Sequence, residues 1–176
     1  MDRIGAEAVQ DRGSVDAADF DDFYRAEFPR LIVLARGLCT PTLAEDVAQE
    51  AMLVALRRWR FVARLERPDL WVRRVCINLA VSSFRRRMVE LRAVVRLTGR
   101  SEPEPLSDAT EELWEAVRSL PERQAQAAAL RFAHDLPVAD IADVLGCTEG
   151  TVKQHLSRAR HTLGSALGRA DEGDAE

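Results

Sequence analysis

Residues 138–163 read VADIADVLGCTEGTVKQHLSRARHTL, and this stretch predicts two short helices joined by a tight turn. The first helix has an apolar face formed by Val138, Ile141, Ala142 and Leu145. Gly146 supplies the permissive backbone that a sharp turn needs, and Thr148 is a candidate N-cap for the second helix. That second helix carries an apolar stripe at helical spacing, formed by Val152, Leu156, Ala159 and Leu163. The pattern is typical of a helix-turn-helix.

The second helix is polar on its other side. Opposite the apolar stripe lie Gly150, Gln154, Ser157, Arg158 and His161, with Lys153 beside them. A helix that buries one side and presents cationic and amide groups on the other suits the major groove of DNA. The alternative is an ordinary helical hairpin whose polar side is only solvated.

Charge is distributed unevenly along the 176 residues, although the formal net charge is only −4. Residues 51–100 contain thirteen arginines and three acidic residues, a net charge of +10. Residues 1–50 and 101–122 each carry −6. Because a polyanion responds to local charge, the basic middle segment is a second candidate nucleic-acid surface.

Several classes of protein and site are disfavoured. Three cysteines (39, 76 and 147) are odd in number and lack metal-ligand spacing, so we expect no disulfide framework, metal or cofactor. The histidines lack a paired carboxylate or nucleophile, so no catalytic site and no enzyme is predicted. No apolar run is long enough to span a membrane and no signal peptide begins the chain, so we expect a cytoplasmic protein.

The chain divides into two helical segments, which predicts an all-α protein of two small domains joined by a flexible acidic linker. The first has a helix from Phe20 to Leu38 that Pro29 kinks or splits, then a helix opened by a capping box at 42–45 and running to about Trp59. A loop over 60–67 leads to a third helix that begins at Pro68 and runs to about Arg87 or on to Arg96. Four helices follow the linker, over 111–119, 121–132, 138–145 and 149–167. The predicted boundaries are a disordered 1–18, a domain over 19–97, a linker over 98–109, a domain over 110–168 and an acidic tail over 169–176.

Asp46, Gln49 and Glu50 share one side of the second helix. They are either acids gathered near a helix N-terminus to suit its dipole, or an acceptor-rich surface for the Arg and Lys of a protein partner. Spacing alone does not decide between these two interpretations.

A polar stripe follows the third helix through Trp71, Arg74, Asn78, Ser82 and Arg85, beside the arginines of the 60–67 loop. Arginines would neutralise phosphates there while the amide reads a base edge. Trp59, Phe61 and Trp71 are candidates for stacking on unpaired bases, and equally for the core.

The two surfaces and the acidic trio together resemble the extracytoplasmic-function (ECF) sigma factors of the sigma-70 family, the type that has only regions 2 and 4. The segments that carry the resemblance are AEDVAQEAMLVALRRW (44–59), PDLWVRRVCINLA (68–80) and GTVKQHLSRAR (150–160). It covers about residues 20–167.

The resemblance implies a role for each surface. It implies that Asp46, Gln49 and Glu50 bind the β′ clamp helices of bacterial core RNA polymerase, with further contacts to the β subunit. It implies that the 60–67 loop, with Arg60, Phe61, Arg64 and Arg67, holds a base flipped from the non-template strand of the −10 element, and that Asn78 helps to read this element. Arg74 and Ser82 join the predicted −10 residues from the polar stripe, although relatives often carry a larger polar residue in place of Ser82. The −35 element would be read by Lys153, Gln154, Ser157 and Arg158. Many relatives also bind a dedicated anti-sigma factor.

Two other functions compete with this interpretation. A free-standing helix-turn-helix regulator would bind palindromic DNA tightly without polymerase. A helical adaptor would use both basic faces to bind acidic proteins.

Overall fold

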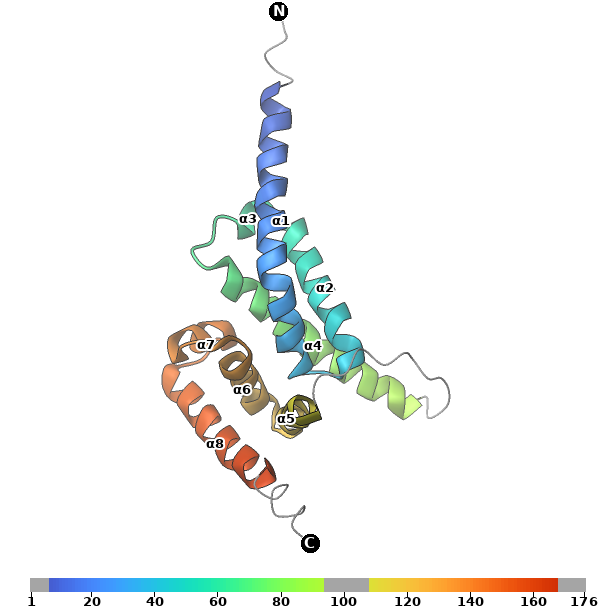
Figure 1. Ribbon diagram of the computed structural model, residues 1–176, viewed down its shortest axis with the longest axis vertical. Helices are drawn as coiled ribbons and strands as arrows, with labels where there is room; N and C mark the ends of the chain where they lie inside the picture. The colour runs from blue at the N-terminus through green and yellow to red at the C-terminus, as the bar shows by residue number, and fades with distance from the viewer. Residues whose placement is uncertain (1–6, 94–107, 168–176) are drawn as a thin grey trace, which may run out of the picture.

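The computed structural model describes the backbone of residues 7–93 and 108–167, and the side chains of residues 19–82 and 110–165. Within these residues the secondary structure is entirely helical, as the sequence predicts (Figure 1). The helices are α1 (Glu7–Arg36), α2 (Pro41–Arg57), α3 (Trp59–Val62), α4 (Pro68–Ala93), α5 (Asp108–Ser119), α6 (Glu122–His134), α7 (Val138–Leu145) and α8 (Glu149–Leu167).

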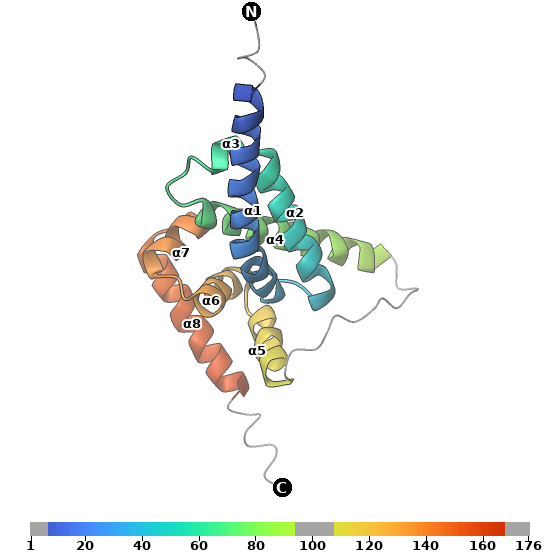
Figure 2. The same cartoon turned by 45° about the horizontal axis from the view of Figure 1, so that its top comes forward.

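Helices α1 to α4 form one unit, which we call the N-terminal unit. Helix α2 packs against α1 and α4, and α4 crosses both of them (Figures 1 and 2). Its centre contains fully buried side chains from three helices, namely Leu31, Leu34, Met52, Val72 and Cys76. Burying an aliphatic side chain of this size contributes about 1.5–3 kcal/mol, so these residues fix how the helices pack.

Helices α5 to α8 form the C-terminal unit. Helix α8 packs against α5, α6 and α7, and α6 also packs against α5 and α7. Leu130, Ile141 and Val152 are fully buried where α6, α7 and α8 meet. The apolar stripe predicted for 149–167 is therefore the side of α8 that faces its own unit.

Helix α1 differs from the prediction in two ways. It begins at Glu7, inside the stretch 1–18 that was expected to be disordered, and residues 1–6 lie outside the described part of the chain. It also continues through Pro29, so of the two predicted alternatives the split is wrong and the kink stays a prediction. Side chains anchor the helix on both sides of the proline, because Tyr24 stacks on Phe28 and Leu31 is fully buried one turn further on.

The start of α2 corrects the predicted capping box. Pro41 is the first helical residue and Thr40 is the N-cap, so the predicted box at 42–45 is wrong. Proline suits this position because its missing N–H needs no partner in the first turn. The Thr42 hydroxyl lies 3.1 Å from the Thr40 hydroxyl.

Helix α3 lies within a segment expected to end α2 and begin a loop. Helix α2 ends at Arg57, and Trp59–Val62 forms a separate short helix. Trp59 is buried, with its ring centroid 5.1 Å from those of both Phe20 and Phe23. Packing on α1 thus turns the chain before the loop begins.

The two units pack directly on each other. Helix α6 lies against α1, and α7 lies beside the N-terminal half of α4 in both views (Figures 1 and 2). The Arg118 guanidinium donates to the carbonyl of Arg36 at 2.8 Å. Gly37 faces the Trp114 ring so closely that a Cβ on Gly37 would lie 2.9 Å from it. The predicted linker and acidic tail fall almost entirely outside the described residues, so the predicted domain boundaries stay a prediction.

Candidate nucleic-acid interface

Helix α8 exposes the polar side that the sequence predicts. Val152, Leu156, Ala159 and Leu163 are buried. Lys153, Gln154, Ser157 and Arg158 are exposed on the other side. The Thr148 hydroxyl accepts a hydrogen bond from the amide of Thr151 at 3.2 Å, which confirms Thr148 as a side-chain cap of this helix. His155 is only partly exposed and its Nδ1 is buried, so it lies between the exposed and the buried sides of the helix.

The turn between α7 and α8 depends on a glycine. Gly146 has φ 64° and ends α7 in the left-handed region, where a side chain is strained. A Cβ there would also lie 2.9 Å from a terminal nitrogen of Arg74. The glycine therefore permits both the turn and the close approach of α4.

The start of the 60–67 segment presents cationic and aromatic groups to solvent. Arg60 and Arg64 are exposed, and the Phe61 side chain is 55% exposed. The Phe61 ring meets the half-buried Trp71 ring edge to face, with centroids 6.4 Å apart. Trp59 lies in the core, so of the three aromatic candidates only Phe61 and Trp71 are accessible for stacking on a base.

The predicted polar stripe of α4 lies on the surface of the helix. Arg74, Asn78 and Ser82 are exposed at four-residue intervals, which places them on one side of the helix. The side chain of Arg85, which continues the stripe, lies outside the described side chains. The structure therefore brings three of the predicted residues of α4 onto one face.

The acidic trio of α2 is exposed on one side of the helix. Asp46, Gln49 and Glu50 all reach solvent, and Glu50 forms a 3.5 Å ion pair with Arg57 that is itself exposed. Leu53 and Leu56, which sequence reasoning missed, are 44% and 49% exposed further along α2. Apolar residues one turn beyond the polar trio could have indicated this exposed apolar surface. The same pattern is as common in a stripe that faces the core, so it did not identify the two leucines.

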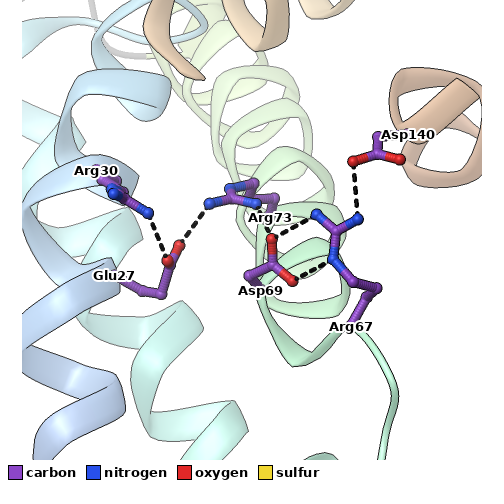
Figure 3. Close-up of polar contacts among 6 residues, drawn as sticks. All are labelled: Glu27, Arg30, Arg67, Asp69, Arg73 and Asp140. Carbon is purple, nitrogen blue, oxygen red and sulfur yellow. Dashed lines mark hydrogen bonds and ion pairs between the residues drawn. The ribbon is translucent and has the colours of Figure 1, made fainter. Parts of the chain in front are cut away.

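A chain of ion pairs runs from α1 to α7 (Figure 3). The Arg73 guanidinium donates to Glu27 at 2.8 Å and also to Asp69. Asp69 accepts two further bonds from Arg67, and Arg67 donates to Asp140 of α7 at 2.9 Å. Sequence reasoning missed Glu27, Arg73 and Asp140, because nothing in their spacing shows that distant charges meet.

Burial and charge shift two pKa values in this network. Burial opposes ionisation of Asp69, but the hydrogen bonds from Arg67 and Arg73 outweigh it and lower its pKa to about 2. Burial lowers the pKa of His134 to about 4, with Arg73 and Arg30 adding to the effect. Both residues are therefore in the form that suits the packing of the two units at neutral pH, namely a carboxylate and a neutral imidazole.

A cleft of about 560 Å³ separates α4 from the C-terminal unit. On the α4 side it is lined by Arg74, Asn78 and Ser82, and on the other side by Arg123, Val144 and others. Arg74 Nε donates to the carbonyl of Val144 at 2.9 Å, which closes one end. The stripe of α4 that was predicted to contact DNA thus faces the helix-turn-helix unit.

Neither a metal centre nor a membrane segment occurs in the described part of the chain. Over its described residues, no group of three or more His, Cys, Asp or Glu could hold a metal ion. No helix among them is long and apolar enough to cross a bilayer. The described cysteines are free, and burial raises the pKa of Cys39 to about 12, which makes that thiol unreactive at neutral pH.

Two family models match this chain, in the order that the two surfaces follow. Sigma-70 region 2 matches residues 23–89, and Sigma-70 region 4 matches residues 110–163. The first covers the acidic trio, α3 and the stripe of α4, and the second covers the helix-turn-helix.

Curated relatives and a solved structure agree with these matches. The chain is 30% identical to the ECF RNA polymerase sigma factor EcfG of Rhodopseudomonas palustris, over 70% of this chain and 71% of that protein. It is 29% identical to the RNA polymerase sigma-E factor of Streptomyces coelicolor, over 86% of this chain and 88% of that one. The fold is similar to that of the sigma factor RpoE of Bartonella quintana, solved in complex with the anti-sigma factor NepR. That match has 24% identity and a TM-score of 0.73, and it covers 85% of this chain and 97% of the other.

The order of the two matched regions and the similarity to these curated relatives lead to one conclusion. This chain belongs to the extracytoplasmic-function sigma factors of the sigma-70 family, the proteins that give RNA polymerase its promoter specificity.

Proposed function

We propose that this sigma factor reads a promoter in two separate parts and binds core polymerase through a third surface. The observation that supports this division is that three groups of solvent-exposed residues lie on three different elements, α2, the α3–α4 segment and α8. Each group has a chemistry suited to a different ligand.

Helix α8 is the part that binds the −35 element. Arg158 and Lys153 bring positive charge, and Gln154 and Ser157 add donors and acceptors for base edges. The side opposite these residues is buried, so the helix can enter a major groove only with this face forward.

The α3–α4 segment is the part that binds the −10 element as its strands separate. The residues assigned to it are Arg60, Phe61, Arg64, Arg67, Arg74, Asn78 and Ser82. The arginines neutralise phosphates, and the Phe61 ring, which is exposed, offers a face on which an unpaired base can stack. A base held outside the stack needs such contacts because unstacking it costs a few kcal/mol.

The outward side of α2 is the part that binds core polymerase. Asp46, Gln49 and Glu50 provide acceptors for cationic side chains of the β′ clamp helices. The exposed Leu53 and Leu56 add apolar contact area beside them. A dedicated anti-sigma factor, such as the one bound to the Bartonella protein, is a further partner that we propose for this chain.

The mechanism is one of assembly. Sigma factors are not known as enzymes, and we propose that this chain acts by binding alone, in the cytoplasm where bacterial polymerase works.

Transcription reconstituted from purified parts tests this function. The protein is combined with bacterial core polymerase and a pool of random promoter DNA, and the transcribed templates are sequenced. We expect transcripts from templates that share two short elements at a fixed spacing. Absence of both core binding and promoter-dependent transcripts would contradict the proposal, and palindromic sites bound without polymerase would favour the free-standing regulator.

A further inference from the structure

The residues proposed to bind the −10 element are partly occupied by the C-terminal unit itself. Arg67 Nη1 donates to the Asp140 carboxylate of α7 at 2.9 Å (Figure 3). Arg74 Nε donates to the carbonyl of Val144, which lies at the other end of α7 from Asp140, also at 2.9 Å. Asn78 and Ser82 line the cleft that α6 and α7 close from the other side. Four of the seven proposed −10 residues therefore face α6 and α7.

Three of the five N–H donors of the Arg67 guanidinium are already bonded to protein carboxylates. Its Nε and Nη2 donate to the two carboxylate oxygens of Asp69, and its Nη1 donates to Asp140. Arg67 therefore contacts two carboxylates, one of which, Asp69, it shares with Arg73. A carboxylate and a phosphate bind a guanidinium in the same way, through oxygens in its plane. Asp140 thus occupies a donor of Arg67 that could otherwise bind a phosphate oxygen.

Arg74 is held by backbone instead of by a charged side chain. The Val144 carbonyl belongs to the last turn of α7, where unpaired carbonyls give a helix end its partial negative charge. Gly146 makes the approach possible, since a Cβ there would lie 2.9 Å from Arg74 Nη2. Gly146 therefore permits both the turn of the helix-turn-helix and the contact with Arg74.

The Arg67–Asp140 ion pair can compete with a phosphate for Arg67, but it holds the two units together only weakly. The Arg67 side chain is 47% exposed and that of Asp140 is 19% exposed. Exposed ion pairs add little to stability and are screened by salt, so the arrangement can be separated by a partner that binds either unit more tightly.

We infer that α7 is an intramolecular cover for the −10 surface, with Asp140 standing in for a DNA phosphate. This inference rests on the proposed −10 role of α4. In the free protein, α7 and the −10 strand compete for Arg67 and Arg74. Binding that separates the two units releases both arginines together, so the −10 surface becomes available when the −35 helix moves away.

Binding of a single-stranded −10 oligonucleotide to the free full-length protein tests the cover. Its sequence is taken from the promoters selected with the polymerase, and affinity is measured by fluorescence anisotropy at low salt. The test variant is Asp140→Asn, which keeps the shape of the side chain but removes its charge. The matched control is Asp143→Asn, which removes the same charge from an exposed position on the same helix.

We expect Asp140→Asn to bind the oligonucleotide about two- to fivefold more tightly than Asp143→Asn, the range expected for loss of an exposed ion pair. Equal affinities in the two variants would overturn the inference, because the gain would then reflect net charge alone. Circular dichroism checks the fold of each variant. Asp140→Ala repeats the comparison if Asp140→Asn is poorly folded, since alanine favours the helix.

Two further variants separate failure of the cover from failure of the proposed −10 role. Arg60→Ala and Asn78→Ala remove proposed DNA contacts without touching the Arg67–Asp140 pair. If they lower oligonucleotide affinity while Asp140→Asn matches its control, only the cover is wrong. If neither lowers affinity, the −10 role of this surface is wrong, and the cover that rests on it is wrong as well.

Discussion

Arg73 and Arg74 are adjacent in the sequence and lie in opposite environments. Arg73 is 3% exposed and bridges Glu27 of α1 and Asp69 of its own helix. Arg74 is exposed and faces α7. A one-residue step turns a helix by about 100°, so Arg73 faces the core while the adjacent Arg74 faces the surface of α4.

Replacing Arg73 by methionine should destabilise the protein by about 3–5 kcal/mol, because Glu27 and Asp69 would lose their buried cation. Urea denaturation followed by circular dichroism measures the free energy of unfolding. Arg30→Met is the matched control, since Arg30 pairs with the same Glu27 but its side chain is 60% exposed. We expect that variant to lose less than about 1 kcal/mol. Similar losses of unfolding free energy in both variants would show that the buried ion pairs of Arg73 stabilise the protein no more than the exposed pair of Arg30.

Replacing Arg158 by alanine should weaken initiation that depends on the −35 element by about 1–3 kcal/mol, the usual range for a base contact. Transcription from the selected promoter and from the same promoter with a mutated −35 element measures the effect. Arg160→Ala is the control, because Arg160 is an exposed arginine of the same helix outside the proposed reading face. An equal and sequence-independent loss in both variants would contradict the role of Arg158.

Helix α2 shows how far a single element can be predicted. Its buried positions, Ala44, Val47, Ala48, Ala51, Met52 and Ala55, recur at helical spacing. This side faces α1 and α4, so the trio at Asp46, Gln49 and Glu50 is left outward. The start of the helix was harder to predict, because a threonine three residues before a glutamate matched a capping box while the adjacent Pro41 matched a first helical position.

Replacing Asp46 by arginine should abolish binding to core polymerase and leave the fold intact, since the side chain is exposed. Pull-down with core polymerase and circular dichroism measure these two properties. Asp22→Arg on α1 is the matched control for the change of charge, because Asp22 is also exposed. Binding retained by Asp46→Arg would return the trio to a simple role at the helix N-terminus.

At the scale of the whole molecule, His134 lies where the two units meet. It ends α6, and its environment contains Arg30 of α1 and both Arg73 and Asp69 of α4. Its Nε2 is buried and has no hydrogen-bond partner among the described residues. A charged imidazole there would lose solvation and face two arginines.

Acidification should therefore weaken the packed arrangement. The pKa of His134 is about 4 when packed and about 6.5 when exposed, so the separated or unfolded state binds the extra proton first. Stability from this residue is complete above about pH 6.5 and falls as the pH drops toward 4. Thermal unfolding between pH 7.5 and 5 measures the change, and His134→Gln should flatten the part of the profile that His134 causes. An identical profile in that variant would contradict this assignment.

The sequence by itself determined the all-helical fold, the helix-turn-helix and the outward groups of α2, α4 and α8. Those features follow from local rules, because helical periodicity decides which side of each helix is buried and Gly146 and Pro68 mark boundaries. Only the tertiary structure decided that Trp59 belongs to the core, that Arg73 is buried and that α7 rests on Arg67 and Arg74. These outcomes depend on contacts between residues about 40 to 70 positions apart, such as Arg67 with Asp140. Periodicity within one helix carries no information about such pairs, because the partner is chosen by how the packed units meet in space.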